Sequence, residues 1–140
     1  MSVEGRENWD DIGKAVLRFA IAFLLIFHGI GKLEHGIMWM KGPLSHFHLP
    51  FFVGYGVYVA EVLAPVLVFV GFLTRPAALV IIFDLIMAIV LVAHSRLFQL
   101  TRGGSYALEV EAFFLLLGVV LFFQGPGRYS LTRGRGPWWL

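Results

Sequence analysis

Residues 54–94 read GYGVYVAEVLAPVLVFVGFLTRPAALVIIFDLIMAIVLVAH, two apolar runs separated by a short polar break. Each run approaches the roughly 20 residues that an α-helix needs to cross a hydrocarbon core of ~30 Å. The break contains Thr74 and Arg75 and is followed by Pro76, a residue tolerated in the first turn of a helix. The two runs are therefore expected to form an antiparallel helical hairpin with a tight turn.

The rest of the chain has the same character. Apolar residues make up 59% of the 140 residues and charged residues 14%, against about 45–50% and 25% in soluble domains. The mean hydropathy of +0.81 is that of an integral membrane protein. Two further apolar segments flank residues 54–94, so the sequence predicts an all-α, antiparallel four-helix bundle. Its spans are expected at about 14–33, 54–73, 76–94 and 106–124.

The segments outside the spans complete the predicted layout. Residues 1–13 are polar and are expected to form a cytoplasmic lead, and residues 125–140 a cytoplasmic tail after the GPG at 125–127. Residues 34–53 are too polar to span and too apolar for a free loop, which predicts an amphipathic or re-entrant cap on the outer face. With both termini inside, seven basic residues lie inside and four outside, as the positive-inside rule favours for a multi-pass cell-membrane protein.

Ionisable side chains recur within these apolar segments. A charge near the bilayer centre costs at least ~2.5–3.5 kcal/mol on insertion scales, so these groups are expected to face one another. At ~1.5 Å of rise per residue, most of them fall in the outer half of the bundle, whereas Arg18 falls in the inner leaflet. The set consists of Arg18, His28, Lys32, Glu61, Asp84, His94, Glu109 and Glu111.

Two interpretations of this set follow. It forms either an ion-pair network that pins the bundle together, with Lys32 facing Glu61 or Glu111, or a polar pocket for a small polar or quinone-like molecule. Buried carboxylates in membranes can carry protons, which also allows proton-coupled transport. Arg18 is expected either to extend to the phosphates of the inner leaflet or to pair with Asp84.

Several chemistries are excluded or not expected. The chain has no cysteine, which excludes thiolate metal sites and cysteine-ligated iron–sulfur clusters. Paired histidines can hold a b-type haem between helices, but the spacing of His28 and His94 is not specific for one, and haem is not expected. His46 and His48 have no flanking carboxylate, so no metal site is predicted. No nucleotide-binding or hydrolase motif occurs, and the basic residues follow membrane topology rather than a nucleic-acid-binding pattern.

A set of short motifs carries a family resemblance from about Arg18 to Leu131. Each motif is weak alone, and their order and positions make the set specific. The motifs are R-x9-HG-x2-KL from Arg18 to Leu33, AE at 60–61, GFLTRPAAL at 71–79, MAI-x4-H from Met87 to His94, a glutamate early in the fourth span, and GPGRYSL at 125–131. In these features the sequence resembles the DoxX family of small four-helix membrane proteins. It departs from the family pattern at Pro65, where a small residue is usual and a kink is expected here, and at Thr132, where an aspartate is usual.

The resemblance implies a membrane subunit of a quinone-linked oxidoreductase system. Proton exchange is then assigned to Glu61 and Glu111, of which Glu111 is preferred over Glu109 as the family glutamate. Substrate binding is assigned to Arg18, His28, Lys32, Asp84, His94 and Glu109. The alternatives are a non-enzymatic assembly or scaffold factor for other membrane proteins, and a small-solute transporter. The expected partners are the lipid bilayer, a redox partner subunit and a second copy of the chain. The residues do not identify a cofactor, and a quinone is the candidate.

Overall fold

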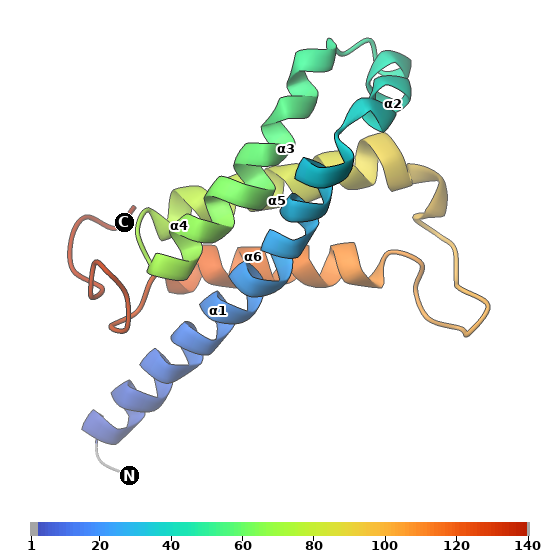
Figure 1. The fold of residues 1–140 in the computed structure, drawn as a ribbon. Coiled ribbons are helices and arrows are strands. Elements are labelled where there is room, and N and C mark those ends of the chain that lie inside the picture. The colour runs from blue at the N-terminus through green and yellow to red at the C-terminus, as the bar shows by residue number, and fades with distance from the viewer. Residues whose placement is uncertain (1–2, 140) are drawn as a thin grey trace.

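The computed structural model describes residues 3–139, and within that range it is helical with no strand. Among these residues, three helices are long and apolar enough to cross a membrane: Gly5–His35, Phe51–Val70 and Thr74–Arg96. The first lies within α1 (Val3–His35); the second contains α3 (Gly56–Tyr58) and α4 (Ala64–Val70); the third begins with α5 (Thr74–Ala88). Figure 1 shows these helices packed obliquely on one another, with α6 (Glu109–Gln124) beside them.

The last helix is shorter than the sequence predicts. α6 contains 16 residues, which is about 24 Å of helix, whereas the predicted span covered 106–124. The three residues before Glu109 form a turn, because Glu109 N donates to Tyr106 O at 3.2 Å. The structure thus supplies three helices of spanning length where the sequence predicted four.

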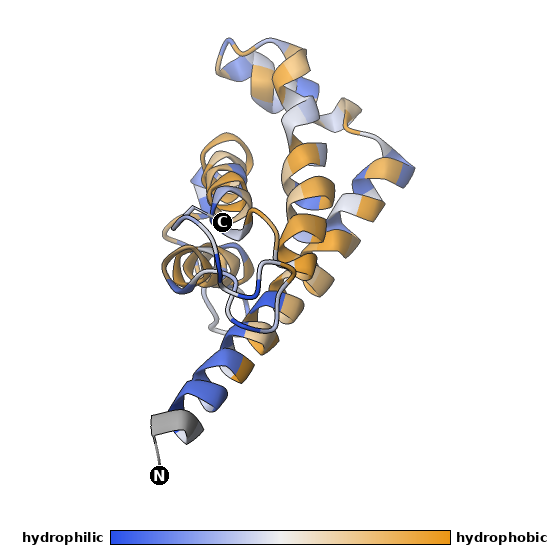
Figure 2. Cartoon of the chain, turned by 90° about the vertical axis from the view of Figure 1, so that its left-hand side faces the viewer, coloured by the Kyte–Doolittle hydropathy of each residue, from blue (hydrophilic) through white to orange (hydrophobic). Residues whose placement is uncertain are grey.

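The first helix is longer than predicted. It begins at Val3 rather than near Lys14. Asp10 pairs with Lys14 at 2.5 Å, one turn later on the same face, and acidic residues near a helix N-terminus interact favourably with the helix dipole. Figure 2 shows a hydrophilic first part of α1 that gives way to apolar residues further along.

The turn between α4 and α5 agrees with the sequence. Gly71 adopts a left-handed conformation with φ of 73° and donates to Leu67 O at 3.0 Å, a common helix C-terminal geometry. The chain then re-enters a helix at Thr74, with Pro76 in its first turn.

The core is built from small and branched side chains. α5 packs mainly on α6, and α1 mainly on α4. Alanines in this core let helix backbones approach closely, which is how membrane helices associate. The buried cluster consists of Ile21, Ala22, Leu25, Ala64, Val68, Ala77, Ala78, Ile81, Leu85, Phe114 and Leu121.

The segment between the first two long helices contains several short helices. They are η1 (Met38–Met40), α2 (Lys41–His46) and η2 (Phe51–Tyr55). Ile37 and Leu44 are buried beneath this segment, whereas Met38, Trp39 and Phe52 are at least half exposed. Residues 34–53 therefore hold apolar side chains on both their inner and outer surfaces.

Candidate functional site

A buried ion pair joins the end of α1 to the second long helix. The ammonium of Lys32, in the last turn of α1, donates to Oε1 of Glu61. Glu61 is only 6% exposed, and the Lys32 side chain retains 23% of its exposure. The second carboxylate oxygen of Glu61, Oε2, is buried and accepts no hydrogen bond from the residues described. That oxygen remains available for a proton or for a donor on a bound molecule.

The helix around Glu61 is locally widened. Residues Val59–Leu63 form a π-helical turn, and Pro65 lies two residues after it, in the first turn of α4. Pro65 has no N–H to donate to the carbonyl of Glu61, and its ring crowds that carbonyl, which gives a physical reason for the wider turn. π-Helical turns are frequent at functional sites. A kink near Pro65 stays a prediction; the structure shows a π-helical turn there, which contains Glu61.

α1 approaches this turn very closely at Gly29. A Cβ atom at Gly29 would collide with the carbonyl oxygen of Glu61 and lie 2.8 Å from Cγ2 of Val62. Only a glycine permits this close approach of two helix backbones. Tyr58 adds a second link, because its hydroxyl donates to the carbonyl of Lys32 at 3.2 Å. Together these contacts fix the Lys32–Glu61 pair between two helices.

Asp84 completes a cluster of three charges. It is half-buried on α5 and interacts electrostatically with both Glu61 and Lys32. Asp84 also lines a cavity of about 100 Å³ between α3, α5 and the cap, whose other lining residues are mainly apolar and include Ala60, Met87 and Leu91. A second π-helical turn, Ile89–Ala93, follows α5 and contributes Leu91. The cavity is thus flanked by two π-helical turns and has a carboxylate in its wall.

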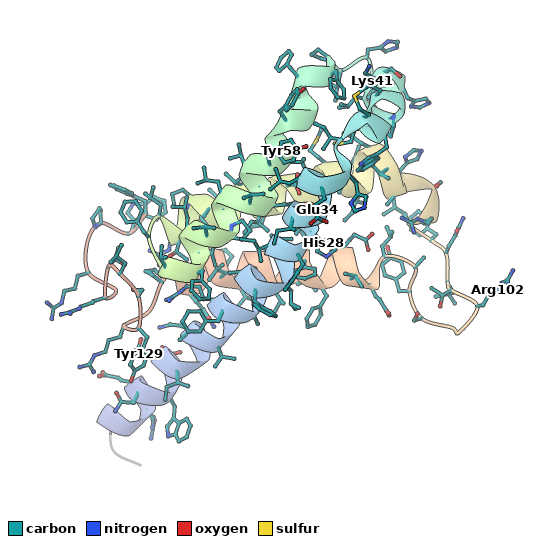
Figure 3. The ribbon with its side chains drawn as sticks, viewed as in Figure 1. His28, Glu34, Lys41, Tyr58, Arg102 and Tyr129 are labelled. Atoms are coloured by element: carbon teal, nitrogen blue, oxygen red, sulfur yellow. The ribbon has the colours of Figure 1, made fainter. Side chains whose placement is uncertain are left out.

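Other predicted site residues lie outside this cluster. His28 is exposed and its ring contacts Phe114 edge-on at 6.1 Å; it precedes Gly29 and so points about 100° away from the face that meets Glu61. His94 is exposed and contacts the ring of Phe47 at 6.0 Å. Figure 3 shows His28 and Tyr58 on their separate helices.

Among residues 3–139, neither glutamate of α6 forms an ion pair with the charged cluster of Lys32, Glu61 and Asp84. Glu109 is exposed and lies beside a groove between α1 and α6, whereas Glu111 is half-buried in the first turn of α6. The ion pairs among residues 3–139 are Lys14–Asp10 and Lys32–Glu61 and involve neither glutamate. No group of three His, Cys, Asp or Glu side chains in the described range could hold a metal ion.

Arg18 takes neither of its expected roles. It is 1% exposed, and its guanidinium donates to three carbonyl oxygens: Pro126 at 2.5 Å, Tyr129 at 2.7 Å and Phe69 at 3.2 Å. These carbonyls belong to the C-terminal tail and to the end of α4. Arg18 is 14 residues before Lys32, about 21 Å along the helix, so the structure brings together Lys32, Glu61 and Asp84 and leaves Arg18 apart from them.

Two residues that take part in these contacts, Tyr58 and Arg75, were not predicted from the sequence. Tyr58 is three residues before Glu61, and that spacing on one helical face could have indicated it. Arg75 donates through Nε to the carbonyl of Phe122 at 3.0 Å at the end of α6. A cation beside unpaired C-terminal carbonyls of a helix is a recognised pattern, but the pairing of α5 with α6 could not be obtained from the sequence alone.

Comparison with known proteins gives two matches. The family model described as DoxX matches residues 13–94, a range that contains Lys32, Glu61 and Asp84. An uncharacterized membrane protein of Mycobacterium tuberculosis is 32% identical over 132 aligned residues, which cover 84% of this chain and 77% of the relative. No solved structure matches the chain.

Proposed function

Since this chain belongs to the DoxX family of membrane proteins, we propose that it is a membrane subunit of a quinone-linked oxidoreductase system. The observation that carries the proposal is the buried Lys32–Glu61 pair with its unpartnered Glu61 Oε2, together with a cavity lined by Asp84 and by Ala60, the residue before Glu61.

The proposal includes four antiparallel crossings with both termini in the cytoplasm. Arg75, at the start of α5, contacts the last turn of α6 through Phe122. Arg18 contacts both the end of α4 and the residues that follow α6. These contacts favour an α6 that returns alongside α5 to the side where α1 begins. A bilayer that thins locally, or flanking residues that reach the interface, would accommodate its short length.

The cavity offers a binding mode for a quinone headgroup. At about 100 Å³ it is smaller than the 300–1,000 Å³ of most ligand pockets, and it would hold a small polar ring rather than a whole isoprenoid quinone. Val80 and Phe83 line it and are also exposed on the outer surface of α5. An apolar tail could therefore remain in the lipid while the ring enters between α3 and α5.

The charged residues would then handle protons and orientation. Asp84, which lines the cavity, would exchange protons with the quinone oxygens, and the Lys32–Glu61 pair would supply protons to Asp84. Glu111, half-buried on α6, would serve as a further carrier. The chain holds no cysteine, so we assign the supply of electrons to a partner subunit with its own redox centre.

The experiment is a binding titration of the purified chain with a short-tailed quinone. We expect saturable binding that weakens in Asp84→Asn, because the amide cannot exchange protons and alters the cavity wall. Glu109→Gln, an exposed carboxylate on α6, is the matched control and should bind as the unmodified chain does. Absence of saturable binding, together with no change of quinone reduction rate in membranes that contain the chain, would refute the proposal.

A second function is favoured by the cap. Met38, Trp39 and Phe52 are 60%, 50% and 71% exposed, which gives the short helices an apolar outer surface suited to docking on another membrane protein. An assembly or scaffold factor would use this surface, and the charged cluster would be structural. Mild-detergent purification distinguishes the two: a redox-cofactor partner supports the oxidoreductase proposal, and a client without a cofactor supports the scaffold.

A further inference from the structure

A large hollow lies at the end of the structure opposite the cap. Its volume is about 860 Å³, and it forms where the C-terminal tail folds against α1 and against the ends of α5 and α6. The tail reaches this position through contacts such as Leu131 N to Val70 O at 2.9 Å. Its charged lining consists of Lys14, Arg75, Arg128, Arg133 and Arg135 with the single carboxylate Asp11. We call this site the tail hollow.

Two of these five cations already have partners. Lys14 pairs with Asp10, and Arg75 donates to carbonyls at the end of α6. The other three, Arg128, Arg133 and Arg135, are exposed and have no carboxylate partner within 4 Å among residues 3–139. Like charges gathered in one concave surface produce a positive potential that attracts anions.

The position of the tail hollow identifies the kind of anion. Its lining includes Arg75 in the first turn of α5 and Gln124 at the end of α6, which are the points where apolar helices end. Trp138 also lines it, and tryptophan is enriched at the membrane–water interface. Lipid phosphates lie at this level, and basic pockets at the cytoplasmic ends of membrane helices bind anionic headgroups.

We propose that the tail hollow binds the phosphate groups of anionic phospholipids from the adjoining leaflet. Arg128, Arg133 and Arg135 supply planar guanidinium groups, which bind phosphate oxygens in a bidentate manner. Bound lipid would hold the tail against α1, α5 and α6. This site is distinct from the charged cluster around Glu61 and does not depend on the quinone proposal.

The test is a titration of the full chain, in non-ionic detergent, with phosphatidylglycerol and separately with phosphatidylcholine, with bound lipid counted by native mass spectrometry. The unmodified chain should bind phosphatidylglycerol in preference. Replacing Arg128, Arg133 and Arg135 together by Gln should weaken that binding by about 100-fold, since each basic residue near an anionic surface contributes about a factor of five.

The matched control replaces Lys41, Arg96 and Arg102 by Gln, three exposed basic residues outside the tail hollow. Figure 3 shows Lys41 and Arg102 far from Tyr129 of the tail hollow. Both variants lose three charges, so non-specific attraction falls equally, and only the tail variant should lose lipid. Equal loss in both variants, or none in the tail variant, would overturn the proposal. Displacement of the bound lipid by excess inorganic phosphate would overturn it in favour of a soluble-anion site.

Discussion

Two cations of α1 have contrasting partners. Lys32 contacts a carboxylate, and the second oxygen of that carboxylate accepts no hydrogen bond from the described residues. Arg18 meets only backbone carbonyls, three of them, at the other end of the helix bundle. A backbone carbonyl does not exchange protons, so we assign Arg18 a structural role. The Lys32 site contains an ammonium and a carboxylate, the groups to which we assign proton exchange.

The role of Arg18 leads to a prediction on stability. Arg18→Gln removes a buried cation and leaves the carbonyls of Phe69, Pro126 and Tyr129 without their donor. We expect the free energy of unfolding to fall by about 3–5 kcal/mol. Each hydrogen bond to a charged donor contributes about 1.5–3 kcal/mol, and water partly replaces the lost bonds. Thermal unfolding in detergent measures the loss, and protease should cut the tail faster.

Arg6→Gln is the control, since Arg6 is exposed on the same helix. It should unfold like the unmodified chain. An Arg18→Gln protein with an unchanged midpoint and a protected tail would contradict the assigned role.

At the scale of helices, the contact between α1 and the π-helical turn depends on one glycine. Gly29→Ala places a methyl group against the Glu61 carbonyl, so the helices must separate. Overpacking of this kind costs about 1–3 kcal/mol, and the Lys32–Glu61 pair should weaken with it. Gly31→Ala is the matched control, because a Cβ there meets nothing within 4 Å; it should leave stability unchanged or raise it by up to about 1 kcal/mol.

The measurement is the unfolding midpoint of both alanine variants in one detergent. Equal midpoints for Gly29→Ala and Gly31→Ala would show that the close approach of the two helices at Gly29 contributes nothing to the stability of the protein.

Much of the element order could be predicted from the sequence. The polar break at Thr74 and Arg75, followed by Pro76, located the turn between the second and third long helices, because proline acts through local backbone geometry. The extension of α1 to Val3 was missed, since a polar helix beyond the membrane leaves no hydropathy signal. The length of α6 was overestimated, because Tyr106–Leu108 are apolar enough to continue a span but form a turn.

The site was predictable in part. Depth along the helices left Glu61 and Glu111 as candidate partners of Lys32, and the structure pairs Lys32 with Glu61. Which side chains reach the site depends on how each helix is rotated about its own axis. A helix that is apolar on every face gives no sequence signal for that rotation. His28 and His94 were therefore expected in the site and lie exposed outside it. The carbonyl partners of Arg18 lie 51, 108 and 111 residues away, a separation that no local pattern encodes.

At the scale of the whole molecule, the number of crossings can be measured directly. The chain has no cysteine, so single cysteines can be introduced without background. Glu7→Cys, Ser45→Cys, Thr101→Cys and Arg135→Cys all replace exposed residues. With four crossings, a membrane-impermeant maleimide on intact cells should label positions 45 and 101 and reach 7 and 135 only after permeabilisation.

Labelling of position 135 together with 101 in intact cells would mean that α6 does not cross. Labelling of position 7 before permeabilisation would invert the proposed orientation.

The central claim is that the Lys32–Glu61 pair belongs to a binding site and is more than a structural link. Glu61→Gln leaves Lys32 without its counter-charge and should cost about 3 kcal/mol, the low end for a buried pair, because Lys32 retains some exposure. The double variant Lys32→Met with Glu61→Gln removes both charges and should recover much of that stability. The decisive measurement is short-tailed quinone binding by this double variant at a temperature where it is folded. The account predicts a stable protein that no longer binds quinone; a stable double variant with unchanged quinone affinity would contradict it.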